Sequence, residues 1–372
     1  MLPSDRRWLA RAFELASLSG RATAPNPRVG AVLAVGERVV GEGRHRRAGR
    51  AHAEALALAE AGEQARGATA YVSLEPCAHV GRTPACTSAL VAAGVRRVVV
   101  GAVDPDPRVR GRGLEHLREA GVEVLLAEGE MARRAREVVE DYLVHREQGR
   151  SFALLKAAAS LDGRIADREG RSRWLTGPEA RRHGRRLRCR FGAILVGVGT
   201  ALADDPLLLP PDGPKGGAFL RCVIDPSLRL DPGCRLLADE GRWSPVLVYT
   251  RDDGATAERR RALEAAGATV VPIEAEGKVL PVREILEDLA RRDVLGVVIE
   301  GGGRTAAEFA AAGLLDKVHW YLAPRLLIDA EARPALAGGP FPLDRSWWGR
   351  IAQSQRLGDD VLLTVYPAPD RK

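Results

Sequence analysis

Aromatic residues, cysteines and long apolar runs are all scarce in this sequence. Phe, Trp and Tyr make up 5% of the 372 residues, which is too few for the interleaved aromatic and basic side chains on which nucleic-acid bases stack. No apolar run approaches the roughly 20 residues that a membrane-spanning helix needs. We therefore expect a protein that partners with neither nucleic acid nor a membrane.

The cysteines are odd in number and scattered, which argues against a disulfide framework. The five positions are Cys77, Cys86, Cys189, Cys222 and Cys234. Metal binding is the better first hypothesis for them. The N-terminus, Met1–Trp8, leads into a charged amphipathic stretch and lacks the apolar core and small-residue cleavage site of a signal peptide. We expect the protein in the cytoplasm.

The composition is that of a soluble globular protein, with 45% hydrophobic and 28% charged residues. The net charge of +7 comes from 56 basic residues interspersed with 49 acidic ones, a mixture that argues against nucleic acid and leaves anionic small molecules open. A chain of 372 residues is too long for one ordinary core and predicts two domains. Whether copies of the chain form a homo-oligomer stays open.

Strand and helix patterns alternate along the chain, which predicts sheets flanked by helices. A polar segment, 145–150, precedes the apolar strand expected at 152–155, so we expect domains at 1–147 and 148–372. In the first domain the patterns predict a hairpin over 29–40, strands over 68–74, 97–103 and 122–126, and helices over 52–63, from Thr83–Pro84 to Gly94, and over 114–120. In the second they predict a helix opened by 176–179, further helices over 257–266, 282–292 and 305–312, and strands over 193–198, 222–225, 246–249, 269–273, 297–300 and 318–322.

The first domain carries the residue types of a deaminase zinc site. His52-Ala53-Glu54 is followed by Pro76-Cys77 and by Cys86, which supply one imidazole, two thiolates and a carboxylate that does not bind the metal. Three protein ligands leave one position open, where zinc lowers the pKa of a water molecule to roughly 7. Glu54 can then take the water proton and deliver it to the ring nitrogen and the departing amine.

The spacing of the two cysteines leaves an alternative open. Residues 78–85 separate Cys77 from Cys86, whereas zinc deaminases usually have Pro-Cys-x-x-Cys. A structural zinc with His79 as a fourth ligand is the competing interpretation. Such a closed site leaves Glu54 without a chemical role.

Five runs in this domain closely resemble the riboflavin-biosynthesis deaminase-reductase family. They are 25–30 (PNPRVG), 43–45 (GRH), 48–49 (AG), 52–54 (HAE) and 75–86 (EPCAHVGRTPAC). In that family the long loop between the cysteines is normal, and its insert separates the family from cytidine, guanine and tRNA adenosine deaminases. The resemblance implies a cytidine-deaminase-like three-layer α/β/α fold for this domain and a catalytic zinc ion.

The resemblance continues through the second half, where it implies a dihydrofolate-reductase-like α/β fold. The matching runs are 156–164 (KAAASLDGR), 172–176 (SRWLT), 197–200 (GVGT), 203–206 (ADDP) and 300–303 (EGGG), in the family's order. The glycine run 301–303 follows an expected strand and precedes an expected helix, so its backbone N–H groups can approach a dinucleotide pyrophosphate. There is no full dinucleotide fingerprint, and Rossmann topology is not supported.

By resemblance the protein is a bifunctional enzyme of riboflavin biosynthesis. The zinc domain would hydrolyse the 2-amino group of a phosphoribosylated diaminopyrimidine. The second domain would use NADPH to reduce the ribosylamino group of the deaminated product to ribitylamino. Glu54 is the expected catalytic residue of the first reaction, and Lys156 is our candidate for assisting the open-chain sugar in the second, as a proton donor or electrostatic aid. The expected partner is a small phosphoribosylated pyrimidine.

The resemblance also implies the binding residues of both sites. Asn26 and His45 hold the pyrimidine, and His79, Arg82 and Asp104 line the rest of the deaminase substrate site. NADPH is contacted by Ala158, Trp174, Thr200, Asp204, Gly302, Gly303, Arg304 and Thr305. The reductase substrate is contacted by Ser172, Arg188, Leu208 and Glu300.

Two positions depart from the family pattern. Asp106 stands where asparagine is more common, and a carboxylate there would repel a phosphate. Pro211 stands where the family has a second phosphate-binding arginine. Either a neighbour such as Arg221 replaces that arginine, or the affinity of the reductase for its substrate is lower.

Two functions of other classes compete with this interpretation. A nucleic-acid deaminase with an accessory binding domain would need the aromatic and basic pattern that the sequence lacks. A zinc-stabilised interaction protein would lack Glu54 or bind no NADPH, so a nucleotide titration separates it from the enzyme.

Overall fold

The computed structural model describes residues 1–78, 85–238, 244–252, 257–275, 277–339, 342–343 and 346–368. The chain divides into two compact units, Met1–Gly149 and Arg150–Lys372. The polar segment 145–150, where we place the domain boundary, contains the last turn of helix α6 (Glu140–Gln148) and then Gly149, which ends the helix with φ 67°. The basic residues His145 and Arg146 in this turn complement the negative end of the helix dipole.

The N-terminal unit is built on a five-stranded sheet in the order β2-β1-β3-β4-β5. Strand β1 pairs antiparallel with β2 and β3, and β3, β4 and β5 run parallel. The strands are β1 (Gly30–Val35), β2 (Arg38–Arg44), β3 (Thr69–Val72), β4 (Arg97–Val100) and β5 (Glu123–Leu126). The predicted hairpin is present and turns at Gly36–Glu37.

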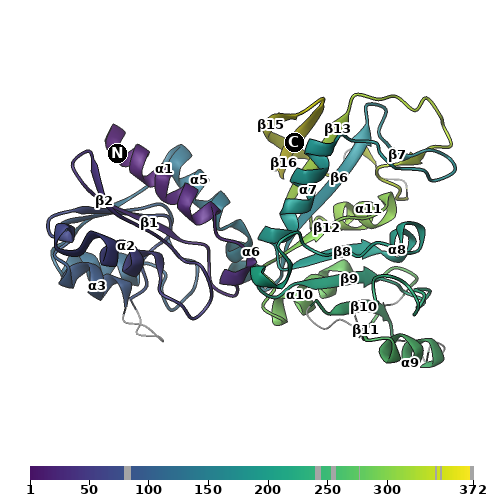
Figure 1. Ribbon diagram of the computed structural model, residues 1–372, viewed down its shortest axis with the longest axis horizontal. Coiled ribbons are helices and arrows are strands. Elements are labelled where there is room, and N and C mark those ends of the chain that lie inside the picture. Colours follow the sequence, from purple (N-terminus) through teal and green to yellow (C-terminus); the bar gives the residue numbers. More distant parts are fainter. Residues whose placement is uncertain are drawn as a thin grey trace. The chain divides into compact units, whose positions relative to one another are not determined.

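Helices cover both faces of this sheet (Figure 1). Helices α1 (Pro3–Ser17) and α5 (Gly129–Val138) pack on one face, and α2 (Ala53–Ala61), α3 (Cys86–Ala92) and α4 (Arg112–Glu119) pack on the other. Short 3₁₀ turns follow α1 (Arg21–Thr23) and α2 (Gly62–Ala65). The expected three-layer α/β/α architecture of this unit is confirmed.

Strand β2 lets helix α2 approach closely because it has no side chain at Gly43. A Cβ atom on Gly43 would lie 2.0 Å from the carbonyl oxygen of Ala53. Only glycine fits at such a distance. The first turn of α2, which follows His52 and carries Glu54, is therefore held against the sheet.

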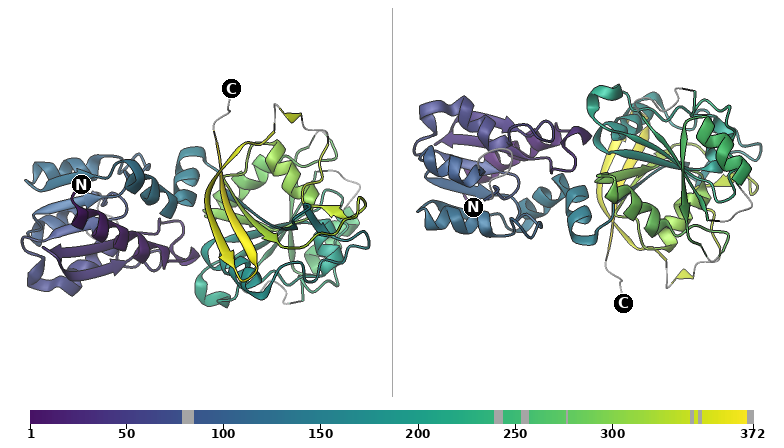
Figure 2. Two further views of the ribbon diagram at one scale, coloured as in Figure 1. Left: turned by 90° about the horizontal axis from the view of Figure 1, so that it is seen from above. Right: turned by 90° about the horizontal axis from the view of Figure 1, so that it is seen from below.

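The C-terminal unit is built on a nine-stranded sheet in the order β11-β10-β9-β8-β12-β6-β13-β16-β15. The strands from β11 to β13 run parallel, whereas β16 and β15 are antiparallel and form one edge, yellow in Figure 2. The strands are β6 (Phe152–Ser160), β8 (Ala193–Gly197), β9 (Leu220–Ile224), β10 (Val246–Arg251), β11 (Ala268–Ile273), β12 (Gly296–Ile299), β13 (Lys317–Ala323), β15 (Gly349–Leu357) and β16 (Asp360–Pro367). A separate small ribbon pairs β7 (Arg164–Ala166) with β14 (Arg333–Pro334).

Helices pack on both faces of this sheet as well, which confirms the expected α/β class. Helices α8 (Val198–Asp204) and α9 (Ala257–Ala265) pack with the face that carries Ile194, and α7 (Pro178–Arg190) packs over Ala158. Helices α10 (Val282–Arg291) and α11 (Gly303–Ala311) pack with the face that carries Leu195. The carboxyl ends of β6, β8 and β12 meet at one edge, where parallel sheets bind ligands. No helix in the described part of either unit has the length and apolar character needed to cross a bilayer.

Some elements differ from the sequence prediction. Helix α3 begins at Cys86 after Ala85, and the predicted start, Thr83–Pro84, lies outside the described residues. Helix α7, by contrast, begins at Pro178 after Gly177, within the predicted start 176–179. The pattern also misses the edge strand β15, because most of its side chains are exposed and its sequence shows no apolar alternation.

A buried ion pair anchors the segment that enters strand β1. The guanidinium of Arg28 donates hydrogen bonds of 2.7 and 2.8 Å to the carboxylate of Asp141 in α6, and another of 2.9 Å to the carbonyl of Val138. Both charged side chains are only 3% exposed. The pair therefore fixes the segment 25–30, which carries Asn26.

We predict that Asp141→Asn lowers the free energy of unfolding by about 3–5 kcal/mol, because it leaves the Arg28 guanidinium buried without a countercharge. Denaturant unfolding of the full chain measures this change. Glu14→Gln is the matched control: it removes an exposed partner of Arg11 and should change the free energy by less than about 1 kcal/mol. Small losses of equal size in both variants would contradict the anchoring role.

Candidate active sites

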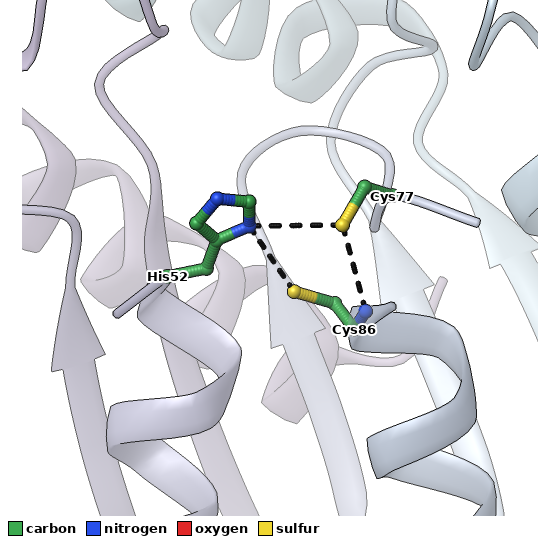
Figure 3. A group of neighbouring side chains, drawn as sticks. All are labelled: His52, Cys77 and Cys86. Atoms are coloured by element: carbon green, nitrogen blue, oxygen red, sulfur yellow. Dashed lines mark hydrogen bonds between the residues drawn. The ribbon is translucent and has the colours of Figure 1, made fainter. Parts of the chain in front are cut away.

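Three metal-binding side chains converge in the N-terminal unit (Figure 3). His52 is the N-cap residue of α2, Cys77 follows strand β3, and Cys86 is the first residue of α3. The Nδ1 atom of His52 lies 3.6 Å from Cys77 Sγ and 3.3 Å from Cys86 Sγ, and the donor atoms all lie within 4.8 Å of one another. The structure thus brings together the three residues predicted to bind zinc.

The chemistry of these donors fits zinc, which prefers imidazole nitrogen and thiolate sulfur. A hydrogen bond from the Cys86 thiol, helped by His52, lowers the pKa of Cys77 and so favours the thiolate form that binds metals. The backbone N–H of Cys86 also donates to Cys77 Sγ, at 3.5 Å. Within the described ranges this is the one group of three such side chains. His79, the alternative fourth ligand, lies outside those ranges.

Glu54 is buried in the first turn of α2, beside this cluster, and is 3% exposed. Burial raises the pKa of its carboxyl group. A raised pKa brings a carboxyl group toward the range in which it both accepts and releases protons near neutral pH. The placement therefore suits the predicted proton-transfer role.

Asn26 and His45 lie beside the zinc ligands. The ring of His45 is 5.4 Å from that of His52, and its Nε2 atom lies 3.4 Å from the amide nitrogen of Asn26. Its Nδ1 atom lies 3.1 Å from the carbonyl of Ala51, which can only accept, so Nδ1 carries the proton and Nε2 accepts from Asn26. Both residues predicted to hold the pyrimidine thus adjoin the metal-binding cluster.

The other residues predicted at the deaminase substrate site are described only in part. Asp104 lies in the loop after β4. Burial raises the pKa of its carboxyl group to about 6. The hydroxyl of Tyr142 donates a hydrogen bond of 3.1 Å to this carboxyl group. His79 and Arg82 lie outside the described residues. Strand β4 neighbours β3, which leads to Cys77, so the loop of Asp104 leaves the same edge of the sheet.

Glu75 is a supporting residue that sequence reasoning missed. Its buried carboxylate accepts hydrogen bonds from the backbone N–H groups of Asp104, Gly111 and Gly113, at 3.1, 2.9 and 2.8 Å. It therefore ties the loop that carries Asp104 to the segment that carries Cys77. Its partners lie far away in the sequence, and the only local signal is its place in the run 75–77 (EPC).

Asp106, the first departure from the family pattern, is neutralised within its own loop. Arg108 donates hydrogen bonds of 3.0 and 2.7 Å to its carboxylate. The hydrogen bond from Arg108 also lowers the pKa of Asp106 to about 2. The charge that would repel a phosphate is therefore compensated by a neighbouring cation.

Arg221 does not replace the arginine missing at Pro211. Its side chain is 0% exposed. Its guanidinium donates to the backbone carbonyl of Ser244 at 2.9 and 2.6 Å and to that of Leu236 at 2.8 Å. Of the two alternatives for Pro211, replacement by Arg221 is therefore not supported, because its donors hold loop backbone together inside the unit.

Three charged residues expected at the reductase site lie together in the C-terminal unit. Arg188 of α7 donates to the two carboxylate oxygens of Glu300 at 3.2 and 3.1 Å, and Nζ of Lys156 lies 3.8 Å from the same carboxylate. Burial alone would raise the pKa of Glu300, but the positive charges of Lys156 and Arg188 lower it. Arg188 also donates to the carbonyl of Leu209 at 3.1 Å, next to Leu208, whose φ is 54°.

The glycine-rich turn opens helix α11, two residues before the predicted start of that helix. Gly302 is the N-cap residue, and its N–H donates a hydrogen bond of 2.9 Å to the hydroxyl of Thr200 in α8. Thr305 packs against Gly197, where a Cβ atom would lie 2.5 Å from the Thr305 hydroxyl. Arg304 is exposed at this positive helix end. The NADPH positions predicted in these segments thus meet where a pyrophosphate is favoured.

The loop that precedes α7 carries further predicted contacts. Trp174 is 61% exposed, and the guanidinium of Arg181 lies 4.4 Å from its ring centroid. Arg173 donates a hydrogen bond of 3.3 Å to the carbonyl of Asp204, which joins this loop to the end of α8. The other two predicted residues are Ser172, in the same loop, and Ala158, on strand β6.

Two family models match the chain, one in each unit. The model described as the RibD C-terminal domain matches residues 151–363. The model described as the cytidine and deoxycytidylate deaminase zinc-binding region matches residues 2–102. The second match covers His52, Cys77 and Cys86.

Full-length relatives combine both units. The riboflavin biosynthesis protein RibD of Escherichia coli K12 is 39% identical over 98% of this chain and 100% of its own length, and that of Aquifex aeolicus is 36% identical over 96% and 97%. Acinetobacter baumannii RibD (form 1) superposes with a TM-score of 0.85 at 34% identity, covering 99% of this chain and 100% of that one. A Thermotoga maritima diaminohydroxyphosphoribosylaminopyrimidine deaminase/5-amino-6-(5-phosphoribosylamino)uracil reductase superposes with a TM-score of 0.84 at 29% identity, covering 98% and 99%.

We predict that Cys86→Ser lowers the zinc content of the purified chain well below one equivalent, because it removes one of three ligands. Metal analysis after dialysis measures the content. Cys234→Ser is the matched control, since Cys234 belongs to the other unit and should not affect binding. A full equivalent of zinc retained by Cys86→Ser would overturn the ligand assignment.

Proposed function

The chain belongs to the RibD family of riboflavin biosynthesis proteins, and on this premise we propose which of its residues carry each activity. It is a bifunctional enzyme with a zinc-dependent deaminase and an NADPH-dependent reductase. The deaminase hydrolyses 2,5-diamino-6-(5-phosphoribosylamino)pyrimidin-4(3H)-one, and the reductase converts 5-amino-6-(5-phosphoribosylamino)uracil into the ribitylamino product. Its partner is a small phosphoribosylated pyrimidine, and we propose the cytoplasm as its compartment.

In the deaminase, His52, Cys77 and Cys86 would hold the zinc ion. The metal, when bound, makes a water molecule nucleophilic at neutral pH. Asn26 and His45 orient the pyrimidine ring, a role supported by their contact with each other beside His52. The remaining substrate contacts come from His79, Arg82 and Asp104.

Glu54 is the acid–base residue of deamination. It takes a proton from the attacking water and delivers protons to the ring nitrogen and to the amino group at C2, which leaves as ammonia. Its burial and its raised pKa support both transfers. A single carboxyl group therefore serves the whole reaction.

In the reductase, the turn 302–305 binds the cofactor pyrophosphate at the positive end of α11. The remaining cofactor contacts come from Ala158, Trp174, Thr200 and Asp204. NADPH supplies the hydride that reduces the sugar carbon. The hydrogen bond between Gly302 and Thr200 supports this assignment, because it holds the turn in place.

Arg188 binds the phosphate of the reductase substrate, and Ser172, Leu208 and Glu300 line the rest of its site. Lys156 donates a proton to the sugar ring oxygen as the ring opens, and the hydride adds to the adjoining carbon. The observation that carries this assignment is the cluster of Lys156, Arg188 and Glu300 at the carboxyl ends of the strands. Glu300 holds the Lys156 amino group close to the reacting sugar.

We predict that Glu54→Gln separates the two activities. Glutamine has nearly the same size but cannot transfer protons, so deamination should fall by about 10² to 10⁴ fold while zinc stays bound. Ammonia release measures the loss. Supplied with the deaminated aminouracil phosphate, the variant should oxidise NADPH at the parental rate; parallel loss of both reactions would mean that one site serves both.

We predict that Arg188→Ala raises the KM for the aminouracil phosphate by about 10- to 100-fold, because charge-assisted hydrogen bonds to the phosphate are lost. Steady-state reduction kinetics measure this, and kcat should fall less than KM rises. Arg185→Ala is the control, since Arg185 is exposed on the same helix. A raised KM for NADPH with an unchanged substrate KM would place Arg188 in the cofactor site instead.

A further inference from the structure

A tyrosine–histidine pair lies beside Lys156 in the C-terminal unit. Strands β6 and β13 pair so that Lys156 is opposite His319 and Ala158 is opposite Tyr321. The Nζ atom of Lys156 lies 5.8 Å from the centroid of the Tyr321 ring. The hydroxyl of Tyr321 lies 2.7 Å from Nδ1 of His183 in α7, and the hydroxyl is buried because Tyr321 is 1% exposed.

Helix α7 makes room for this arrangement at Gly184. A Cβ atom there would lie 3.0 Å from Cε of Lys156, and 3.8 Å from both its Nζ atom and the Tyr321 hydroxyl. The absence of a side chain at Gly184 lets the lysine extend between the helix and the tyrosine. His183, the residue before it, is therefore held at a fixed distance from the same two side chains.

Burial keeps both partners of this hydrogen bond uncharged. Burial, with the negative charge of Glu300, raises the pKa of Tyr321, so its hydroxyl keeps its proton. Burial, with the positive charge of Arg186, lowers the pKa of His183. A neutral imidazole and a protonated hydroxyl can form this hydrogen bond in either direction, depending on which ring nitrogen carries the proton. The ring centroid of His319 lies 6.1 Å from that of His183. Burial lowers the pKa of His319 to about 3. Neither imidazole therefore adds charge near Lys156.

We propose that His183 is a positioning residue of the reductase that acts on Lys156 through Tyr321. The hydrogen bond to His183 fixes the Tyr321 ring, and the ring face and Glu300 together hold the Lys156 ammonium. Without the imidazole the buried hydroxyl loses its hydrogen-bond partner, and the ring moves to find another. The inference rests on the role proposed above for Lys156.

The test compares His183→Leu, which cannot form a hydrogen bond, with His183→Asn, whose amide group can donate or accept in place of Nδ1. We expect His183→Leu to lower the kcat of reduction by about tenfold while KM for NADPH and for the aminouracil phosphate stays within about twofold. His183→Asn should restore most of the rate. Arg185→Leu, an exposed change on the same helix, should leave the kinetics unchanged.

Tyr321→Phe removes only the hydroxyl and keeps the test valid if His183→Leu does not fold. It should lower kcat as much as His183→Leu does. Since both changes break one hydrogen bond, the double variant should be no slower than either single one. Parental kcat in His183→Leu and Tyr321→Phe, or effects that multiply in the double variant, would overturn the proposal.

Lys156→Met, measured in the same assay, separates this inference from the proposed function. If Lys156→Met nearly abolishes reduction while His183→Leu and Tyr321→Phe run at the parental rate, only the positioning role of His183 fails. If Lys156→Met itself reduces at the parental rate, the role of Lys156 fails and the inference fails with it. Loss in all three variants, with rescue by His183→Asn, supports both.

Discussion

Both active sites depend on partly buried charge that is compensated inside the protein. The Glu300 carboxylate is held by Arg188 and Lys156, and the Cys77 thiolate lies against His52 and a backbone N–H group. A charged group buried without such partners would become neutral, or its segment would move into contact with water. The contacts that make burial tolerable are therefore the same contacts that hold the reacting groups in place.

The two units meet opposite chemical requirements. Deamination needs soft donors for a metal and one buried acid, which the first turn of α2 and the start of α3 supply. Reduction needs cations for a phosphate and a helix end for a dinucleotide, which α7, β6 and α11 supply. Each unit has its own buried core.

The sequence predicted what depends on short runs and missed what depends on distant contacts. The zinc ligands and the glycine turn lie in local motifs, and alternation located most of the strands that carry them. The spacing of Cys77 and Cys86 alone did not distinguish a catalytic from a structural zinc site. The resemblance to the deaminase-reductase family favoured the catalytic one. The alternative at Arg221 stayed open in the sequence because a sequence does not show whether an arginine is buried. The roles of Glu75 and His183 depend on partners 29 to 138 residues away, which no periodic pattern indicates.

The central claim is that one chain performs deamination and then reduction at separate sites. The most direct measurement gives the purified chain the diaminopyrimidine phosphate, with and without NADPH, and follows ammonia and NADPH together. We expect one ammonia per substrate with and without NADPH, and NADPH oxidation that begins only as the deaminated product accumulates. No ammonia release without NADPH, or NADPH oxidation that runs ahead of ammonia release, would contradict it.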